Sequence, residues 1–399
     1  MQCGYFFYFY RYMRGKPKIV FICDKNERTS FGRLTMNLLD AVHDSFETHV
    51  LWLKTPKFFA GEAARMSASE SVADARGFTV HEIWTKSLYT GFFAFRAPLK
   101  KALREIAPDI VFFIRPELGF LVPVAKSACP SAREVMFVHD TFAETLYPHS
   151  IKFKLLNMFF VRGTLCADGY VYNSNWTRGE AAKYFGKKMA DAPGKVIGCP
   201  IDSALFKAPD SPASAKERAV FRRKNGMRNF QGMCLNVSLD EPRKNIDTYF
   251  EMARLRPDVA FVRVGKFSER LRAIVNEKNL YNVFHFNEFS AQELREFYRH
   301  ADLMVYPSFL EGFGLPPIEA IACGTPAVCA RASAVAENLD GVCPLITPAD
   351  DAEAYARVLD RVLAGENVVN EDAVRKLLDY CSMKGFAERV LEFLETLGL

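Results

Sequence analysis

The sequence predicts an α/β protein built from two doubly wound parallel sheets, and three observations support that prediction. Short apolar runs typical of buried parallel strands alternate with amphipathic helical stretches along most of the chain. The alternation restarts at Gly232, after a segment over residues 207–216 that is rich in Pro, Ser and Ala. A chain of 399 residues is also too long for one ordinary core. We therefore expect two Rossmann-like domains.

The first domain is expected over residues 17–206. Its predicted strands are the apolar runs at 17–23, 48–53, 109–114, 134–138, 169–172 and 195–202. Gly32 and Arg33 are expected to open an amphipathic helix, and a basic amphipathic helix is expected over 98–106. Ser174 has the composition and position of a helix N-cap. Loops that follow such strands are the usual place for a ligand.

The second domain is expected over residues 207–375. Its predicted strands lie at 233–237, 259–264, 283–286, 303–306 and 326–330. Residues 376–399 are expected to be helical and to cross back to the first domain. Two such domains imply a ligand-binding cleft between them. Residues 1–16 form an aromatic extension, which is either translated from a start codon assigned too early or a patch that touches a membrane.

Composition narrows the classes of function. The net charge of +5 and the pI of about 8.6 favour phosphate ligands or an anionic membrane surface over nucleic acid. The ten cysteines are scattered singly, which predicts buried free thiols in a reducing cytoplasm. Neither a GxGxxG fingerprint nor a Walker phosphate loop is present, so ordinary dehydrogenases and ATPases are disfavoured. No apolar run reaches the roughly 18 residues of a membrane span.

The most informative stretch runs from Tyr306 to Pro326. An apolar strand is followed by a loop with two glycines, and then by Pro316-Pro317, which suits the first turn of a helix. A strand, a glycine-bearing loop and a helix N-terminus together make an anion site. Glu311 and Glu319 accompany this site, which fits a ligand that carries both phosphates and hydroxyls, such as a nucleotide sugar. Alternatively, Glu319 stands in the first helical turn because of the helix dipole alone.

Four blocks in order make the second half resemble the retaining GT-B glycosyltransferases of family four, also called glycosyl transferases group 1. These blocks are residues 236–245, 264–266, 289–302 and 306–326. The resemblance implies a GT-B fold, with the two domains facing each other across the cleft. It also implies a retaining transfer of a mannose- or glucose-type hexose from a UDP-, GDP- or ADP-sugar, without a metal or other cofactor. The acceptor would be a hydroxyl of a glycan or of a lipid-linked molecule.

The resemblance also assigns roles to charged residues. Lys244, helped by Arg243, would neutralise the diphosphate, whose negative charge grows as the glycosidic bond breaks. Glu311 would hold the transferred sugar, and Glu319 would accept hydrogen bonds from the ribose hydroxyls. In the first half, His139 follows a predicted strand and would face the donor sugar or position the acceptor.

Backbone groups complete the site that the resemblance implies. The N–H groups of Phe313, Gly314 and Leu315 would bind the β-phosphate together with Glu311. Gly265 resembles a glycine at a strand end, and Gly32 stands where the family has a glycine-rich turn near the diphosphate. This chain departs from the family at Ser238, where an arginine is common after the strand, and the turn before Gly32 lacks the family's other glycines.

The sequence says least about the acceptor and about where in the cell the protein acts. Basic and aromatic residues mix over 84–101 and 151–162, which suits either an interfacial segment or a buried helix with a basic edge. A cytoplasmic mannosyltransferase of polysaccharide biosynthesis, peripheral on the inner face of the membrane, is the leading hypothesis. The missing glycines leave two alternatives, which are a catalytically idle partner subunit that binds sugar nucleotide or glycan, and a nucleotide-sugar epimerase.

Overall fold

The computed structural model describes residues 16–25, 29–54, 76–85, 94–141, 151, 154, 158, 161–208, 213–287 and 289–398. The chain forms two compact units, of which unit 1 comprises Met1–Gly198 with Lys384–Leu399 and unit 2 comprises Cys199–Met383. The units divide after Gly198, whereas the sequence analysis drew the boundary after residue 206. Each unit contains one parallel sheet flanked by helices, so the predicted fold class is confirmed.

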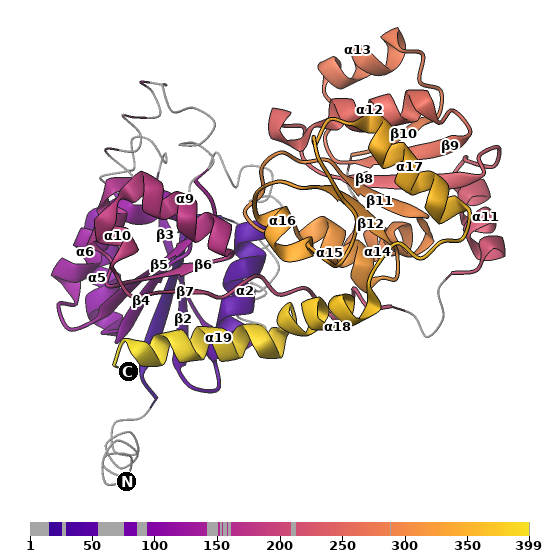
Figure 1. Ribbon diagram of the computed structural model, residues 1–399. Helices are drawn as coiled ribbons and strands as arrows, with labels where there is room; N and C mark the ends of the chain where they lie inside the picture. Colours follow the sequence, from indigo (N-terminus) through magenta and orange to yellow (C-terminus); the bar gives the residue numbers. More distant parts are fainter. Residues whose placement is uncertain are drawn as a thin grey trace. The chain divides into compact units, whose positions relative to one another are not determined.

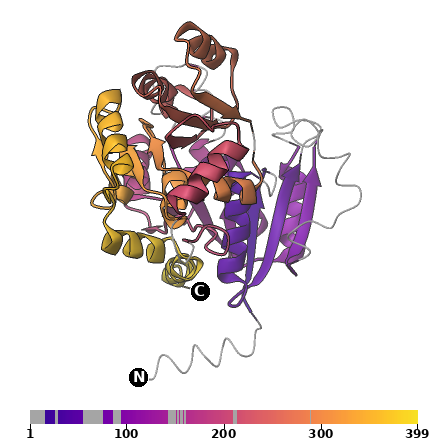
Figure 2. The ribbon, with the colours of Figure 1, turned by 90° about the vertical axis from the view of Figure 1, so that its right-hand side faces the viewer.

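Unit 1 contains a seven-stranded sheet in the order β3-β2-β1-β4-β5-β6-β7, in which every neighbouring pair is parallel (Figures 1 and 2). The strands are β1 (Lys18–Cys23), β2 (Glu47–Lys54), β3 (Thr79–Trp84), β4 (Ile110–Phe113), β5 (Arg133–Val138), β6 (Gly169–Tyr172) and β7 (Gly194–Val196). Strand β3 was not predicted, because its side chains are mostly exposed or half-buried and its sequence mixes polar with apolar residues. Strand β7 is shorter than the predicted run at 195–202.

Helical segments connect and flank these strands. They are α2 (Ser30–Val42), α5 (Arg96–Ile106), η1 (Pro116–Leu121), α6 (Val122–Ala128), η3 (Arg162–Cys166), α9 (Asn175–Phe185), α10 (Lys187–Ala190) and α19 (Met383–Thr396). Ser174 caps α9 as predicted, since its Oγ accepts a hydrogen bond from the N–H of Thr177 at 3.0 Å.

The C-terminal helix α19 packs on unit 1 (Figure 1), and the chain returns to this unit at Lys384, whereas the sequence analysis drew that boundary before residue 376. Gly169 gives the helix room, because a Cβ atom there would lie 2.8 Å from the ring of Phe393. The Nε of Arg389 donates to the carbonyl of Ile197 at 2.8 Å, and Lys195 forms an ion pair with Glu392. The last helix is therefore tied to the same unit as the first strand.

Unit 2 contains a six-stranded parallel sheet in the order β10-β9-β8-β11-β12-β13. The strands are β8 (Gly232–Val237), β9 (Val259–Val264), β10 (Val283–Phe286), β11 (Leu303–Tyr306), β12 (Ala327–Ala330) and β13 (Leu345–Ile346). The helices are α11 (Ala215–Lys224), η4 (Pro242–Lys244), α12 (Ile246–Leu255), α13 (Glu269–Glu277), α14 (Ala291–His300), α15 (Leu315–Ala322), α16 (Ser333–Leu339), α17 (Ala352–Leu363) and α18 (Glu371–Tyr380). One apolar cluster covers each face of this sheet.

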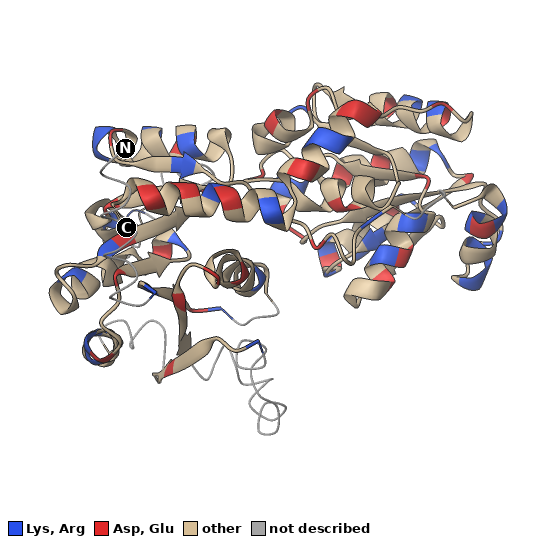
Figure 3. Ribbon diagram, turned by 90° about the horizontal axis from the view of Figure 1, so that it is seen from below, with Lys and Arg blue, Asp and Glu red and all other residues tan. Residues whose placement is uncertain are grey.

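The charged residues are spread over the surface elements (Figure 3), and the described cysteines are free thiols, as the composition suggested. Blue and red residues are interspersed over most of the described helices (Figure 3). The cysteines of the described residues are free thiols, and most of them are buried. Within those residues, no helix is both long and apolar enough to cross a bilayer.

Candidate functional site

The carboxyl edge of the unit 2 sheet gathers most of the predicted donor residues. Strand β8 leads into the turn η4, which ends at Lys244, and the neighbouring strand β11 leads into the loop that carries Glu311. Because adjacent parallel strands end at the same edge, two loops that are distant in sequence meet there. The structure brings Lys244, Arg243 and Glu311 into direct contact.

Lys244 and Glu311 form a buried ion pair. The Nζ of Lys244 lies 2.6 Å from Oε1 of Glu311, and the two residues are 7% and 6% exposed. Asn245 directly follows in the left-handed conformation (φ 52°), and its Nδ2 donates to the carbonyls of Pro307 and Ala349. These two hydrogen bonds fix the end of η4 against the loop after β11.

Two hydroxyls that the sequence analysis did not assign to the site complete the environment of Glu311. Oε1 of Glu311 accepts hydrogen bonds from Tyr306 at 2.9 Å and from Ser308 at 2.6 Å. The backbone N–H of Glu311 donates to Oγ of Ser333 at 2.8 Å. Both Tyr306 and Ser308 lie within the stretch singled out from the sequence. Their position on either side of Pro307, where the predicted strand ends, is the sequence feature that could have identified them.

Arg243 is the second cation of this cluster. Its NH1 donates to Oε2 of Glu311 at 3.1 Å and to the carbonyl of Leu310 at 2.8 Å. Its Nε lies 2.7 Å from Oε2 of Glu241. Arg243 is therefore engaged by carboxylates and carbonyls of the two loops, and it fixes Glu311 from the side opposite Lys244.

Burial and charge act against each other in this pair. Burial lowers the pKa of Lys244, and the positive charge of Arg243 adds to that decrease, while Glu311 opposes it. Burial alone would raise the pKa of Glu311, but attraction to Lys244 and Arg243 holds that pKa below its ordinary value. The two cations thus favour the ionised form of Glu311, and the charge of Glu311 in turn favours the protonated form of Lys244.

The N-terminus of α15 lies next to this cluster. Gly314 occupies the N-cap position with φ 92°, and a Cβ atom there would lie 2.9 Å from Cγ2 of Val335. The helix begins at Leu315, so the N–H groups of its first turn have no partner within the helix. Phe313 precedes the cap, and its carbonyl accepts from Nδ2 of Asn338. Phe313, Gly314 and Leu315 thus lie where the sequence predicts backbone donors.

Glu319 does not stand in the first helical turn, which corrects the sequence analysis. Since α15 already begins at Leu315, Glu319 lies in the second turn, and the first turn contains no acidic residue. The dipole explanation for Glu319 therefore loses its basis, because the dipole acts mainly within the first turn. Its half-buried carboxylate accepts a hydrogen bond from Tyr298 at 3.0 Å.

Gly265 follows β9 and is required by its surroundings. Its φ is 128°, and a Cβ atom would lie 2.1 Å from the carbonyl oxygen of Ser238. The end of β9 and the start of the loop after β8 are therefore in backbone contact. This close approach explains a glycine here without a ligand, although it lies next to the predicted diphosphate loop.

The two predicted residues of unit 1 lie at the carboxyl edge of its own sheet. His139 follows β5, and its ring packs edge-on against Phe31 of α2 with ring centroids 4.4 Å apart. Burial disfavours the charged imidazole, but Asp140 at 3.1 Å raises the pKa of His139 above its ordinary value. Gly32 lies inside the first turn of α2, not in a turn that precedes it, and its N–H donates to Oγ1 of Thr29.

Sequence reasoning missed polar residues that surround His139. Asp24 directly follows β1 and is 2% exposed, and Arg115 lies two residues after β4 with its Nε 3.5 Å from that carboxylate. Buried side-chain atoms of Asp24, Arg115, His139 and Asn173 have no hydrogen-bond partner among the described residues. The signal that finds them is position, since each residue directly follows a predicted strand.

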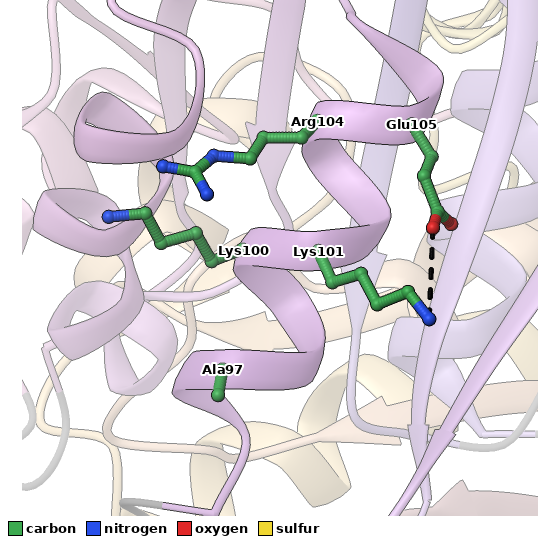
Figure 4. A pocket seen from close by; sticks show the side chains of 5 residues that line it. All are labelled: Ala97, Lys100, Lys101, Arg104 and Glu105. Atoms are coloured by element: carbon green, nitrogen blue, oxygen red, sulfur yellow. Dashed lines mark ion pairs between the residues drawn. The ribbon is translucent and has the colours of Figure 1, made fainter.

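A basic pocket on α5 is separate from these loops. It is lined by Ala97, Lys100, Lys101, Arg104 and Glu105, all from one helix (Figure 4). Lys101 forms an ion pair with Glu105 at 3.9 Å, while the helix buries Leu99 and Leu103 beneath. The sequence left open whether this segment is interfacial or buried with a basic edge, and the described helix has a buried apolar side and exposed basic residues. The part of the segment at 86–93 lies outside the described residues, as do residues 1–15 and most of 151–162.

Metal ligation has no obvious location in the described part of the chain. No group of three or more His, Cys, Asp or Glu side chains there is arranged to hold an ion.

Comparison with known families gives a match within the second unit. Residues 217–377 match the family model described as glycosyl transferases group 1. Among curated proteins, the MMP alpha-(1->4)-mannosyltransferase of Mycolicibacterium hassiacum is 37% identical over 136 residues, which are 32% of this chain and 33% of that protein. The O-antigen chain mannosyltransferase B of Escherichia coli is 31% identical over 136 residues, 32% of this chain and 35% of that protein. The matches thus span about a third of these relatives.

Comparison with solved structures covers nearly the whole chain. The sucrose-phosphate synthase of Thermosynechococcus elongatus aligns with a TM-score of 0.75 at 16% identity, over 96% of this chain and 99% of that one. Anabaena HepE, solved with UDP and glucose, aligns with a TM-score of 0.73 at 16% identity, over 95% and 100% of the two chains. At such identities the likeness shows the fold, which is that of the GT-B glycosyltransferases.

Proposed function

We propose, from the match of residues 217–377 to the family model of glycosyl transferases group 1, that the protein is a retaining hexosyltransferase. It transfers a mannose- or glucose-type hexose from a nucleoside diphosphate sugar to a hydroxyl of a glycan or of a lipid-linked acceptor. The observation that carries the proposal is the buried pair of Lys244 and Glu311 beside the N-terminus of α15. This arrangement combines a fixed cation, backbone N–H donors and a carboxylate, which suit a ligand with both phosphates and hydroxyls.

The proposed reaction assigns a place to each of these groups. The bond between the anomeric carbon and the β-phosphate oxygen breaks, and the electron pair stays on the leaving diphosphate. The acceptor oxygen forms its bond to the same face of the anomeric carbon, and its proton passes to the departing phosphate oxygen. Lys244 and the first-turn N–H groups of α15 stabilise the negative charge that develops on the diphosphate.

The two carboxylates bind the hydroxyl groups of the donor. Glu311 orients hydroxyls of the transferred sugar and holds Lys244 in its charged form. Glu319 accepts hydrogen bonds from the ribose, and Tyr298 orients its carboxylate by the contact at 3.0 Å. His139 of unit 1 has a raised pKa because Asp140 offsets its burial, so it is available as a donor to a sugar or acceptor hydroxyl.

The named relatives and neighbours support this choice of substrates. The curated relatives include two mannosyltransferases, and the solved structure of HepE contains UDP and glucose. A thermal-shift screen of UDP-, GDP- and ADP-sugars tests the proposal. We expect one diphosphate sugar to raise Tm by mass action on the folded state. If none of them raises it, the proposed function is wrong.

We also propose a peripheral membrane location, carried by the basic side of α5 (Figure 4). Lys100 and Arg104 point to one side of the helix, while Lys101 points to the other side and pairs with Glu105. Clustered cations of this kind attract anionic lipid headgroups, each by about 1 kcal/mol at the surface. Vesicles containing phosphatidylglycerol should bind the protein at low salt, and the variant K100E/K101E should bind them less. Equal binding by both proteins would contradict a lipid contact at α5.

An assay of nucleoside diphosphate release, run beside the thermal-shift screen, separates the enzyme from a binding subunit. A partner subunit that only binds sugar nucleotide would show the Tm increase but release no nucleoside diphosphate. A nucleotide-sugar epimerase would alter the sugar without depending on an acceptor. The transferase predicts diphosphate release that depends on the acceptor.

A further inference from the structure

Arg263 is a fully buried arginine in the middle of the unit 2 sheet. It lies on β9 between Val262 and Val264, and its exposed fraction is 0%. Its side chain shares a sheet face with Val259 and Phe261, which belong to the apolar cluster beneath α12. An arginine at such a position is unusual, because charged side chains are almost never fully buried unless they are paired.

The guanidinium of Arg263 lacks an ionic partner among the described residues. Its NH1 donates to the carbonyl of Val264, the next residue along the same strand. Its Nε and NH2 are buried and have no hydrogen-bond partner in that part of the chain. Burial lowers the pKa of Arg263 to about 10, although Asp240 opposes this, so the side chain is still a cation at neutral pH. A buried charge in this state is costly to the fold.

This cation lies directly below the loop compared with a diphosphate loop. A Cβ atom at Gly265 would lie 2.7 Å from NH1 of Arg263 and 2.1 Å from the carbonyl oxygen of Ser238. The guanidinium is thus separated from the loop after β8 by little more than one layer of backbone. Arg263 pairs in register with Asn236, which lies two residues before Ser238.

Arg243, a cation of the loop after β8, is already engaged. Its NH1 donates to Leu310 and Glu311, and its Nε contacts Glu241. Glu311 and Glu241 offset most of its charge at the loops. Arg263 forms no ion pair with a carboxylate in the described chain, although Asp240 lies near enough to raise its pKa, and its buried Nε and NH2 have no hydrogen-bond partner there.

We propose that Arg263 is a third cation for the donor diphosphate, supplied from β9 below the loop and not from the loop itself. The proposal rests on the proposed function and names a residue that positions the phosphates through its charge. Because the guanidinium is shielded from water, solvent screens its field at the loop only weakly. The diphosphate in turn supplies the negative charge that the buried arginine lacks.

The test compares a nucleoside with its diphosphate, since only the diphosphate should sense the charge of Arg263. Dissociation constants of uridine, guanosine or adenosine and of the matching diphosphate are measured by calorimetry for the wild type, R263Q and R263K. We expect R263Q to bind the diphosphate about tenfold more weakly at an unchanged nucleoside affinity, and R263K to recover most of the loss. Equal weakening for both ligands, or no weakening, would overturn the proposal.

A matched control removes another buried arginine of the same unit. Arg222 is 8% exposed and pairs with Asp302 at 3.3 Å, away from the phosphate loop. R222Q should lower stability but leave the ratio of nucleoside to diphosphate affinity unchanged. A change of that ratio in R222Q similar to that in R263Q would mean that loss of stability, and not the charge of Arg263, sets the ratio.

A second measurement keeps the test decisive if R263Q does not fold. In the wild type, the ¹⁵Nε signal of Arg263, identified by its loss in R263K, should shift on addition of the diphosphate and not of the nucleoside. An unchanged signal would overturn the proposal. If no nucleoside diphosphate binds the wild type, the proposed function fails, and inorganic pyrophosphate then tests Arg263 alone by the same shift.

Discussion

The Nζ of Lys244 lies 2.6 Å from Oε1 of Glu311, and both side chains are more than nine-tenths buried. The two residues come from loops that follow the neighbouring strands β8 and β11. Removing a partner from such a pair leaves an uncompensated buried charge, which typically costs about 3–5 kcal/mol. The pair thus links the stability of the loops to the protonation state of the cation that would receive the diphosphate.

The variant E311Q tests the electrostatic role of Glu311. Burial lowers the pKa of Lys244 and Glu311 opposes that decrease, so loss of the carboxylate lowers the pKa of Lys244 further. We expect the alkaline limb of the pH profile of kcat/KM to move to lower pH in E311Q, with a lower plateau at neutral pH. E241Q removes a more exposed carboxylate from the loop that carries Lys244 and should move the limb little. An unmoved limb in E311Q would contradict the coupling.

The variant G265A tests the backbone contact between β9 and the loop after β8. Its Cβ atom would lie 2.1 Å from the carbonyl oxygen of Ser238, so the loop must move. Gly365 is the matched control, because its φ is 87° and nothing lies within 4 Å of an added Cβ. We expect both variants to lose about 1–2 kcal/mol of stability from the positive φ, and G265A to lose diphosphate binding as well. Chemical denaturation and calorimetry measure the two effects.

The buried carboxyl of Glu134 predicts a pH dependence of stability. Glu134 is 0% exposed, and burial together with a hydrogen bond to Asp168 raises its pKa to about 7, although Lys126 lies 2.9 Å away. Because the folded pKa exceeds the ordinary 4.5, stability from this group is present below pH 4.5 and is lost as pH rises through 7.

Replacement by glutamine isolates this contribution. The difference in the free energy of unfolding, E134Q minus wild type, should increase by on the order of 2 kcal/mol between pH 5 and pH 8. Urea denaturation at several pH values measures the difference. E105Q, which changes an exposed carboxylate of unit 1, should run parallel to the wild type. A difference between E134Q and the wild type that stays constant with pH would argue against a raised pKa.

Chelation tests whether the proposed cations are enough for the leaving group. Lys244 and the helix N-terminus of α15 supply fixed positive charge where a metal ion would otherwise act. Transferase activity should therefore survive dialysis against EDTA, within about twofold. A loss that Mg²⁺ or Mn²⁺ restores would show that the enzyme requires a metal ion.

The sequence predicted most strands because their apolar runs are short and end in polar loops. It placed Lys244 and Glu311 at the same donor site through the family resemblance, but it did not predict the direct ion pair between them. Strand β3 was missed because an edge strand alternates less clearly, and the two-residue strand β13 is too short to produce a pattern. Arg263 was not identified as a candidate site residue, because a single charged residue within an apolar run does not change the prediction of a strand. The turn that holds Glu319 depends on Gly314 as the N-cap, and sequence alone did not place that cap.

Release of nucleoside diphosphate from UDP-, GDP- and ADP-hexoses, followed by chromatography, tests the central claim most directly. The wild type should release the diphosphate from one of these donors, faster with an acceptor glycan present. K244M should reduce kcat by about 10²–10³-fold, since it removes the cation that stabilises the leaving group. K376M, which changes an exposed lysine of α18, should behave as the wild type. Release by K244M at the rate of the wild type would contradict the account.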